Sequence, residues 1–490
     1  MTISKCRSDS VPASGVYLAL ASCLALAVSG GRAFAHSSEG GFVLLLPTDQ
    51  YLAGAAIAVA ATFFLLVALP GRLTARLGRT SLPVARISRT AARRIAIVTS
   101  SASFMILGLL VLAGHIGERD PLENPLPIAV WTLFWVVLTL FQAVFGNLWP
   151  ALNPWTGPLA ILRRLTGSSL GAMALLPLPR RIGSSIAILQ FAWFAWSELI
   201  SLAPSDPGEL ATKVVLYWLV NAAGMLVFGE REWADRAEPF SVYFRLVGGL
   251  SPLVSSKDPR DGALKIALAW PGTALAARPP LDRSGIVFLV LALGASTFDG
   301  LSRTFLWLGL NGINPLEFPG RSAVILSGTI GLAVTTVTLF VAFEAAVAFG
   351  CRLAGRTDLF RTASGRLAYS LTPIAIAFHG SHHLVGFLVD GQQALIAFSD
   401  PFALGWDLLG WRGAYATTSF LNTLSGTTAL FNTQTAIIVA GHVVGIVMAH
   451  AIAGDIFGTG KTATRSQLML APMMVFYTAF GLWLLATPHI

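Results

Sequence analysis

Three histidines lie in an otherwise apolar stretch of this 490-residue chain, IAIAFHGSHHLVGF. The spacings of three and four residues place His379 on the same helical face as both His382 and His383. Polar side chains are costly in hydrocarbon, so histidines in such a stretch are candidates for function. Neutral imidazoles are ligands for transition metals and also donate and accept protons.

A second apolar stretch, QTAIIVAGHVVGIVMAH, carries Gln434, His442 and His450 at intervals of eight residues. Each interval turns an α-helix by about 80°, so neighbouring pairs can share one broad stripe. All three side chains cannot meet at one point. A column of this kind also fits a path for protons or metal ions through a membrane.

Carboxylates and amides complete the set of candidates. Glu198 lies in FAWSELI, Asp299 in GASTFDGLS, and Asp390 and Gln392 in VDGQQ. Under the topology derived below, Glu198, Asp299 and Asp390 lie toward the periplasmic ends of their helices. So do His382, His383 and Gln434, whereas His442 lies near mid-membrane and His450 near the cytoplasm. We therefore expect a periplasm-facing site that holds a divalent transition metal, Zn, Cu, Fe or Mn. The alternative is that the histidines bond backbone carbonyls or hydroxyls of neighbouring helices and the carboxylates cap helix ends.

The first 35 residues have the pattern of a signal peptide. Lys5 and Arg7 precede an apolar run over 15–30, and the triplet Ala33-Phe34-Ala35 fits a peptidase site. Cleavage after Ala35 leaves His36 as the first residue, whose α-amine and imidazole together can chelate a metal ion. The alternative is that His36 is an ordinary solvated residue.

Composition indicates a membrane protein. Hydrophobic residues make up 54% and charged residues 12% of the chain, whereas soluble domains carry about 25% charged residues. The net charge of +9 is concentrated in a few short loops, which favours membrane topology over nucleic-acid binding. Of three cysteines, Cys6 and Cys23 leave with the signal peptide, so the mature chain can form no internal disulfide.

Hydropathy predicts an all-α, polytopic transmembrane bundle of about ten helices over residues 36–490, since a span needs about 20 apolar residues. The expected spans are 51–69, 95–114, 127–148, 184–203, 211–229, 284–302, 323–350, 366–389, 429–450 and 467–487.

Basic residues test this count, because they collect in cytoplasmic loops. The arginine-rich loops 70–94 and 351–366 fall on one side of the ten-helix topology, together with Arg163, Arg164, Arg180, Arg181, Lys461 and Arg465. Both termini then face the periplasm of a bacterial inner membrane, as a cleaved signal also requires. The long loop 230–283 is cytoplasmic in this topology and has room for a small hairpin near 262–280.

The chain resembles a family of bacterial polytopic membrane proteins named fenitrothion hydrolase, which are membrane-bound hydrolases of organophosphorus esters. The resemblance rests on NPW at 153–155, EPFSVYF at 238–244, TFDG at 297–300, DGQ at 390–392, SDP at 399–401, the Ala-His start at 35–36, and the frame of Gln434, Gly441, His442, Ala449 and His450. In that family's pattern the eighth helix carries one histidine, which matches His382.

The resemblance implies hydrolysis of a phosphotriester by a metal-activated hydroxide. Ligands would come from His36, His382, Asp299, His442 and His450, with Asp299 and Glu198 also as catalytic candidates. A small apolar ester could enter from the bilayer. The chain has no H-E-x-x-H, G-x-S-x-G or Walker A motif.

The competing hypothesis is a transition-metal or proton-coupled transporter, with a metal ion as substrate. Pro373 and Gly441 interrupt helices beside the histidines, and broken helices often line transport sites. The sequence leaves open whether a second membrane subunit is needed. Haem ligation within one helix would need two histidines 13 or 14 residues apart, on the order of four helical turns, and no pair in these spans has that spacing.

Overall fold

The computed structural model describes residues 48–68, 81–167, 174–314, 320–411, 413–458 and 460–487. In this part of the chain eight helical segments are long and apolar enough to cross a membrane, and the protein is an all-α, multi-pass membrane bundle. The segments are α2 (Thr48–Ala68), α4 (Arg89–Ile116), α5–η2–α6 (Pro125–Ile128, Ala129–Leu138, Thr139–Phe145), α10 (Pro207–Phe228), α14 (Arg283–Ser302), α16 (Arg321–Leu353), α20 (Leu424–Phe457) and α21–α22 (Lys461–Gln467, Leu470–Ala486).

Shorter elements join these spans. The other helices are α7 (Trp149–Leu152), α8 (Thr156–Thr166), η3 (Arg180–Ile182), α9 (Ser185–Leu199), α11 (Glu230–Arg236), α12 (Pro239–Gly248), α13 (Thr273–Ala276), α15 (Phe305–Leu310), η5 (Thr357–Leu359), α17 (Phe360–Leu367), η6 (Ala368–Ser370), α18 (Leu371–His382), α19 (Leu384–Ser399) and η7 (Ser419–Asn422). The strands are β1 (Ser81–Ile87), β2 (Leu253–Lys257) and β3 (Leu264–Ala269).

Helix starts follow from local capping. The side chains of Ser88, Asp206 and Asp282 accept hydrogen bonds from the first turns of α4, α10 and α14. Such caps satisfy N–H groups that have no partner within the helix. Pro207 follows its cap at the first helical position, where a missing N–H costs nothing.

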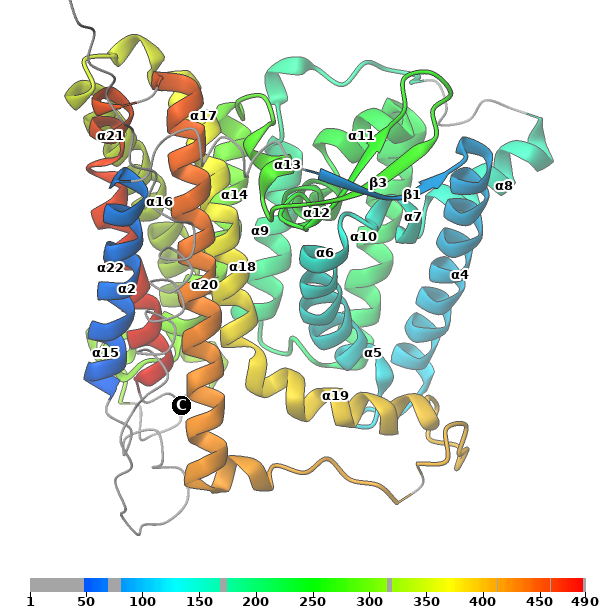
Figure 1. Cartoon of the computed structure of the whole chain (residues 1–490). Coiled ribbons are helices and arrows are strands. Elements are labelled where there is room, and N and C mark those ends of the chain that lie inside the picture. The colour runs from blue at the N-terminus through cyan, green and yellow to red at the C-terminus, as the bar shows by residue number, and fades with distance from the viewer. Residues whose placement is uncertain are drawn as a thin grey trace, which may run out of the picture.

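Helix α14 forms the centre of the bundle. It is apolar all round and most of its residues are buried, whereas α4 exposes most of its surface to the bilayer. Helices α9, α16, α18 and α22 pack around α14 (Figure 1). The core therefore holds Asp299, one turn before the end of α14, inside the protein.

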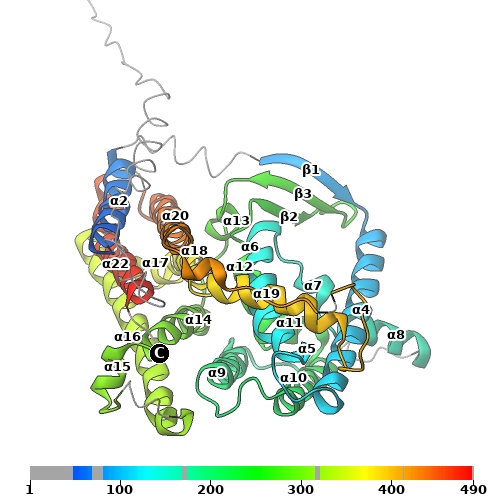
Figure 2. The same cartoon turned by 90° about the horizontal axis from the view of Figure 1, so that it is seen from below.

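The predicted spans 184–203 and 366–389 differ from the structure. Helix α9 ends at Leu199 and is shorter than a full span. Helix α18 ends at His382, and α19 then crosses the end of the bundle from α18 toward α4 (Figure 2). A hydropathy window joins α18 and α19 because the segments before and after the three histidines are both apolar. The prediction of one continuous eighth span is therefore wrong.

The segment 230–283 is more ordered than a loop. Helix α12 is buried against α9 and α6, and Phe240 and Phe244 pack in the core. The hairpin is formed by β2 and β3 at 253–269, earlier than the predicted 262–280, and β1 adds a third antiparallel strand in the order β1-β3-β2. This sheet lies at the end of the bundle opposite α19 (Figure 1).

An ion pair on the sheet gives a pH prediction. Lys265 Nζ lies 2.9 Å from Asp258 Oδ2, and its hydrogen bond lowers the pKa of the Asp258 carboxyl, with a smaller contribution from the Arg260 backbone N–H. A lowered pKa in the folded protein stabilises it above the ordinary carboxyl pKa, and this stabilisation is lost as pH falls through the folded value.

We therefore expect β2–β3 amides to exchange faster with deuterium, after correction for intrinsic rates, when pH falls from about 6 to about 3. The Asp258→Asn variant should show fast exchange at both pH values. Equal pH dependence in the variant and the wild type would contradict the assignment.

Candidate functional site

Asp299 is at the centre of the candidate site. Its Oδ2 atom lies 2.8 Å from His382 Nε2, and its Oδ1 atom accepts a hydrogen bond from Arg303 Nη2 at 2.9 Å. The Asp299 side chain is 5% exposed and that of His382 is 13% exposed. Both carboxylate oxygens thus have a cationic or polar partner, and the buried carboxylate fixes the orientation of the imidazole.

The His382 ring is held in one orientation on two sides. Phe378, one turn earlier on α18, stacks on it with ring centroids 5.8 Å apart. Since Nε2 donates to Asp299, the neutral ring carries its lone pair on Nδ1. A carboxylate that orients a histidine in this way prepares the other ring nitrogen to accept a proton or a metal ion.

The neighbouring histidines make different contacts. His383 Nδ1 bonds the His379 carbonyl oxygen at 3.0 Å, and its Nε2 lies 3.8 Å from Asp299 Oδ2, too far for a hydrogen bond. His379 Nε2 bonds the Trp135 carbonyl oxygen at 3.1 Å, and its buried Nδ1 has no partner. Of the three, only His382 bonds Asp299.

Glu198 approaches Asp299 from the last turn of α9. It lies within electrostatic range of Asp299, Arg303 and Arg321. Arg321 Nη1 donates to the carbonyl oxygens of Glu198 at 3.2 Å and Ser201 at 3.1 Å. Two acidic and two basic residues therefore lie in the region where α9, α14 and α16 approach each other.

A cavity of about 380 Å³ opens beside this cluster. Asp299, Arg303 and Arg321 line it together with Trp307 and Phe298. Guanidinium groups in such a cavity can bind and polarise an oxygen atom that carries partial negative charge.

Three predicted polar residues instead connect structural elements. Asp390 lies on α19 and accepts a hydrogen bond from Thr132. Gln392 bonds the backbone N–H and carbonyl of Thr417 and so ties down the segment after α19. Gln434 donates to the Ser381 carbonyl oxygen, and the Ser381 hydroxyl donates to that of Gln434, which joins α18 to α20.

The histidines of α20 lie at separate places. His442 Nδ1 bonds the Ile438 carbonyl oxygen at 2.9 Å, and its buried Nε2 has no partner although Tyr477 lies beside the ring. His450 bonds Gln467 of α21 at 3.3 Å. Of the predicted site residues the structure therefore brings Asp299 and His382 into contact, with Glu198 within electrostatic range of Asp299, and His450 bonds Gln467 elsewhere.

The described residues do not by themselves provide a metal site. Within the ranges given above, no three His, Cys, Asp or Glu side chains are placed to hold one ion. Asp299 has both oxygens engaged, and His382 offers only Nδ1. The predicted signal peptide, with Cys6 and Cys23, and the predicted ligand His36 lie outside the described residues.

Two features near the site were not predicted. Residues Ala129–Leu138 form a π-helix, η2, a rare conformation that often occurs at functional sites. Glu238 is fully buried and accepts hydrogen bonds from Trp149 Nε1, the Tyr217 hydroxyl and two backbone N–H groups at the start of α12. The Glu-Pro pair at the start of EPFSVYF is a capping signal that could have identified Glu238.

Replacement of Glu238 by glutamine should destabilise the protein by about 1–3 kcal/mol, because an amide brings a donor toward groups that are all donors. The measurement is the thermal unfolding midpoint in detergent. Glu232→Gln is the matched control, since Glu232 is half-exposed and bonds only Arg236 among the described contacts. Equal midpoints for the two variants would contradict the role of Glu238.

No protein-family model matches the chain, and comparison with curated proteins and with solved structures finds no match either.

Proposed function

We propose that this membrane protein is a hydrolase of neutral phosphotriesters, with His382 as general base and Asp299 as the residue that orients it. The observation that carries the proposal is the 2.8 Å contact between His382 Nε2 and a buried carboxylate whose other oxygen accepts a hydrogen bond from Arg303. The resemblance to the fenitrothion hydrolases supports the same reaction class.

In the proposed reaction His382 Nδ1 takes a proton from a water molecule as its oxygen attacks phosphorus. The bond between phosphorus and the leaving alcohol breaks, and that alcohol takes up a proton, so one water is consumed for each diester and alcohol formed. Arg303 and Arg321 stabilise the charge that develops on the phosphoryl oxygen. Glu198 balances the charge of Arg321 in the absence of substrate.

The metal is a separate part of the proposal and depends on His36. A transition metal would activate the attacking water when bound, and His36 with His382 Nδ1 would be its ligands. With a metal on Nδ1 the ring could not accept a proton, so the metal-ligand and general-base roles of His382 are alternatives. We expect the purified protein to begin at His36 and to hold about one transition-metal ion. The His36→Ala variant should retain as little metal as the His382→Ala variant.

N-terminal sequencing and elemental analysis of the wild type and both variants test this expectation. A mature chain that begins elsewhere, or full metal content in His36→Ala, would remove His36 from the site. The general-base role of His382 would be unaffected by that result.

The topology predicted from the sequence has both termini in the periplasm of a bacterial inner membrane. In that topology the α19 end of the bundle would face the periplasm. A reporter fused at Asp120 should then be active in the periplasm and one fused at Arg356 should not. The reverse pattern would put the site on the cytoplasmic side.

Transport is the second candidate, and His442 favours it. An imidazole nitrogen without a partner in the middle of α20 is a place where a proton or cation could pause. The two functions are distinguished by the assay: an enzyme hydrolyses a neutral aryl phosphotriester in detergent solution, whereas a transporter moves cations only across a sealed vesicle membrane. Hydrolysis in detergent that Asp299→Asn abolishes supports the enzyme.

A further inference from the structure

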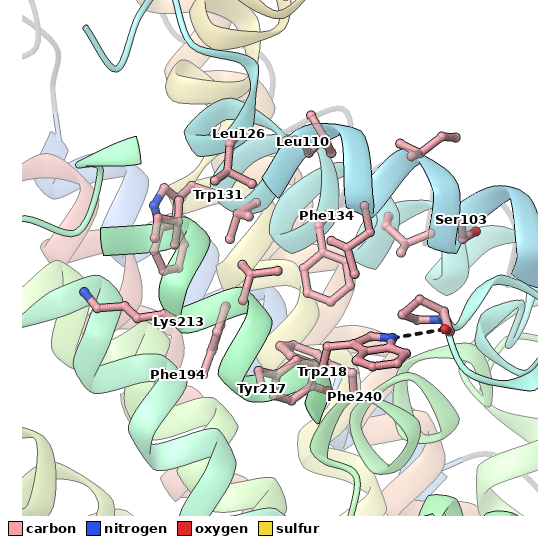
Figure 3. Close-up of a pocket in the computed structure, with 18 of the residues that line it drawn as sticks. Ser103, Leu110, Leu126, Trp131, Phe134, Phe194, Lys213, Tyr217, Trp218 and Phe240 are labelled. Atoms are coloured by element: carbon pink, nitrogen blue, oxygen red, sulfur yellow. Dashed lines mark hydrogen bonds between the residues drawn. The ribbon is translucent and has the colours of Figure 1, made fainter. Parts of the chain in front are cut away.

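Aromatic side chains enclose a second cavity, of about 310 Å³, between α4, η2, α9, α10 and α12. Nine aromatic residues line it, and Figure 3 shows Trp131, Phe134, Phe194, Tyr217, Trp218 and Phe240 directed toward the same space. The volume is that of a pocket for a small organic molecule.

The aromatic walls are fixed before any ligand binds. Phe134 and Phe194 both pack edge-to-face on Phe240, with centroids 4.6 and 5.0 Å away. The indole N–H groups of Trp131 and Trp218 donate to the carbonyl oxygens of Pro204 and Pro154, each at 3.1 Å. Because these donors are already satisfied, the rings present mainly carbon to the cavity, as a flat apolar guest requires.

One polar group in the wall lacks a partner. Ser197 lines the cavity, and its buried hydroxyl has no hydrogen-bond partner among the described residues. Buried polar groups are nearly always bonded, so this hydroxyl indicates a missing acceptor or donor. The Lys213 ammonium at the same cavity pairs with Glu209 at 3.6 Å, so it needs no anion from the ligand.

Residues that line the cavity are also partly exposed. Ile106 and Trp193 line it and are 54% and 37% exposed. Ile106 belongs to α4, which has few buried residues and would face lipid in a membrane. A molecule dissolved in the hydrocarbon can therefore enter without crossing water.

We propose that this cavity binds a neutral molecule with a flat ring system, taken from the lipid phase, whose one polar oxygen bonds the Ser197 hydroxyl. Flat rings match aromatic walls in edge-to-face and offset geometry, whereas a charged guest would leave its charge unpaired. The site goes beyond the proposed hydrolysis and does not depend on it. It adjoins the candidate centre, since Ser197 precedes Glu198 and Phe134 precedes Trp135.

The test uses 1-nitronaphthalene, which quenches indole fluorescence and carries an oxygen acceptor, with the full-length protein in lipid nanodiscs. Two matched pairs of variants each add one aromatic ring, either inside or outside the cavity. Val214 and Leu110 line it, and their neighbours Val215 and Leu109 point outward, 36% and 55% exposed. The variants are Val214→Phe against Val215→Phe, and Leu110→Phe against Leu109→Phe.

We expect saturable quenching by 1-nitronaphthalene in the wild type. Its affinity should fall about tenfold or more in each inner variant, because the added ring fills the cavity, and should stay at the wild-type level in each outer variant. Ser197→Ala should weaken 1-nitronaphthalene about 2- to 10-fold and leave naphthalene unchanged. Equal binding within both pairs, or quenching that rises linearly as in simple lipid partition, would overturn the proposal. Because binding is read without turnover, an inactive enzyme that still binds would refute the hydrolysis alone.

Discussion

Replacing His382 with alanine is expected to lower the rate of phosphotriester hydrolysis by about 10²- to 10⁴-fold, the range typical for loss of a general base. Of His379, His382 and His383, His382 lies nearest to Asp299, so its loss removes the oriented imidazole and leaves the other two in place. The measurement is kcat in detergent solution with a neutral aryl phosphotriester.

His115→Ala is the control for this variant, because His115 is exposed near the end of α4. It should keep the wild-type rate. If His382→Ala also kept that rate, or if His383→Ala alone removed activity, the assignment of the base to His382 would be wrong.

A methyl group added to Gly441 should disturb the packing of α18 against α20. A Cβ atom there would lie 2.2 Å from Ala377 Cβ and 2.7 Å from the Pro373 carbonyl oxygen, so the backbones would have to separate. Small residues allow such close approach of helices in membranes. We expect Gly441→Ala to cost about 1–3 kcal/mol or more of stability, as overpacking does.

Gly454→Ala on the same helix is the matched control, since nothing lies within 4 Å of the Cβ position there. The thermal unfolding midpoint in detergent should fall for Gly441→Ala and stay the same or rise for Gly454→Ala. A midpoint unchanged in both variants would mean that the two helices separate at little cost. Since His442 follows Gly441, the first variant should also shift the environment of that ring.

The spanning helices could be predicted because length and apolarity alone decide them. The windows at 95–114, 284–302 and 323–350 each fall within one long helix, α4, α14 and α16. Hydropathy could not reveal the end of α18 at His382, because the break separates two equally apolar segments. Nor could it reveal the π-helix, since its AVWTLFWVVL sequence carries no signal distinct from an α-helix.

The sequence could indicate which polar residues lie near one end of the bundle, but not their contacts. The depth argument grouped Glu198, Asp299 and His382 with other polar residues, and the contact between Asp299 and His382 could not be read from it. Their pairing depends on how α9, α14 and α18 rotate, which no single sequence determines. The eight-residue steps on α20 turn Gln434, His442 and His450 toward α18, α22 and α21 in succession, so they contact different helices.

The central claim is that His382 and Asp299 act as one unit, and a double-mutant cycle on hydrolysis tests it most directly. The rates of His382→Ala, Asp299→Asn and the double variant are measured in detergent under the same conditions. Residues that act as a unit lose their effect together, so the double variant should be about as slow as the slower single variant. A double variant whose loss equals the product of the two single losses would show that the residues act independently and would contradict the account.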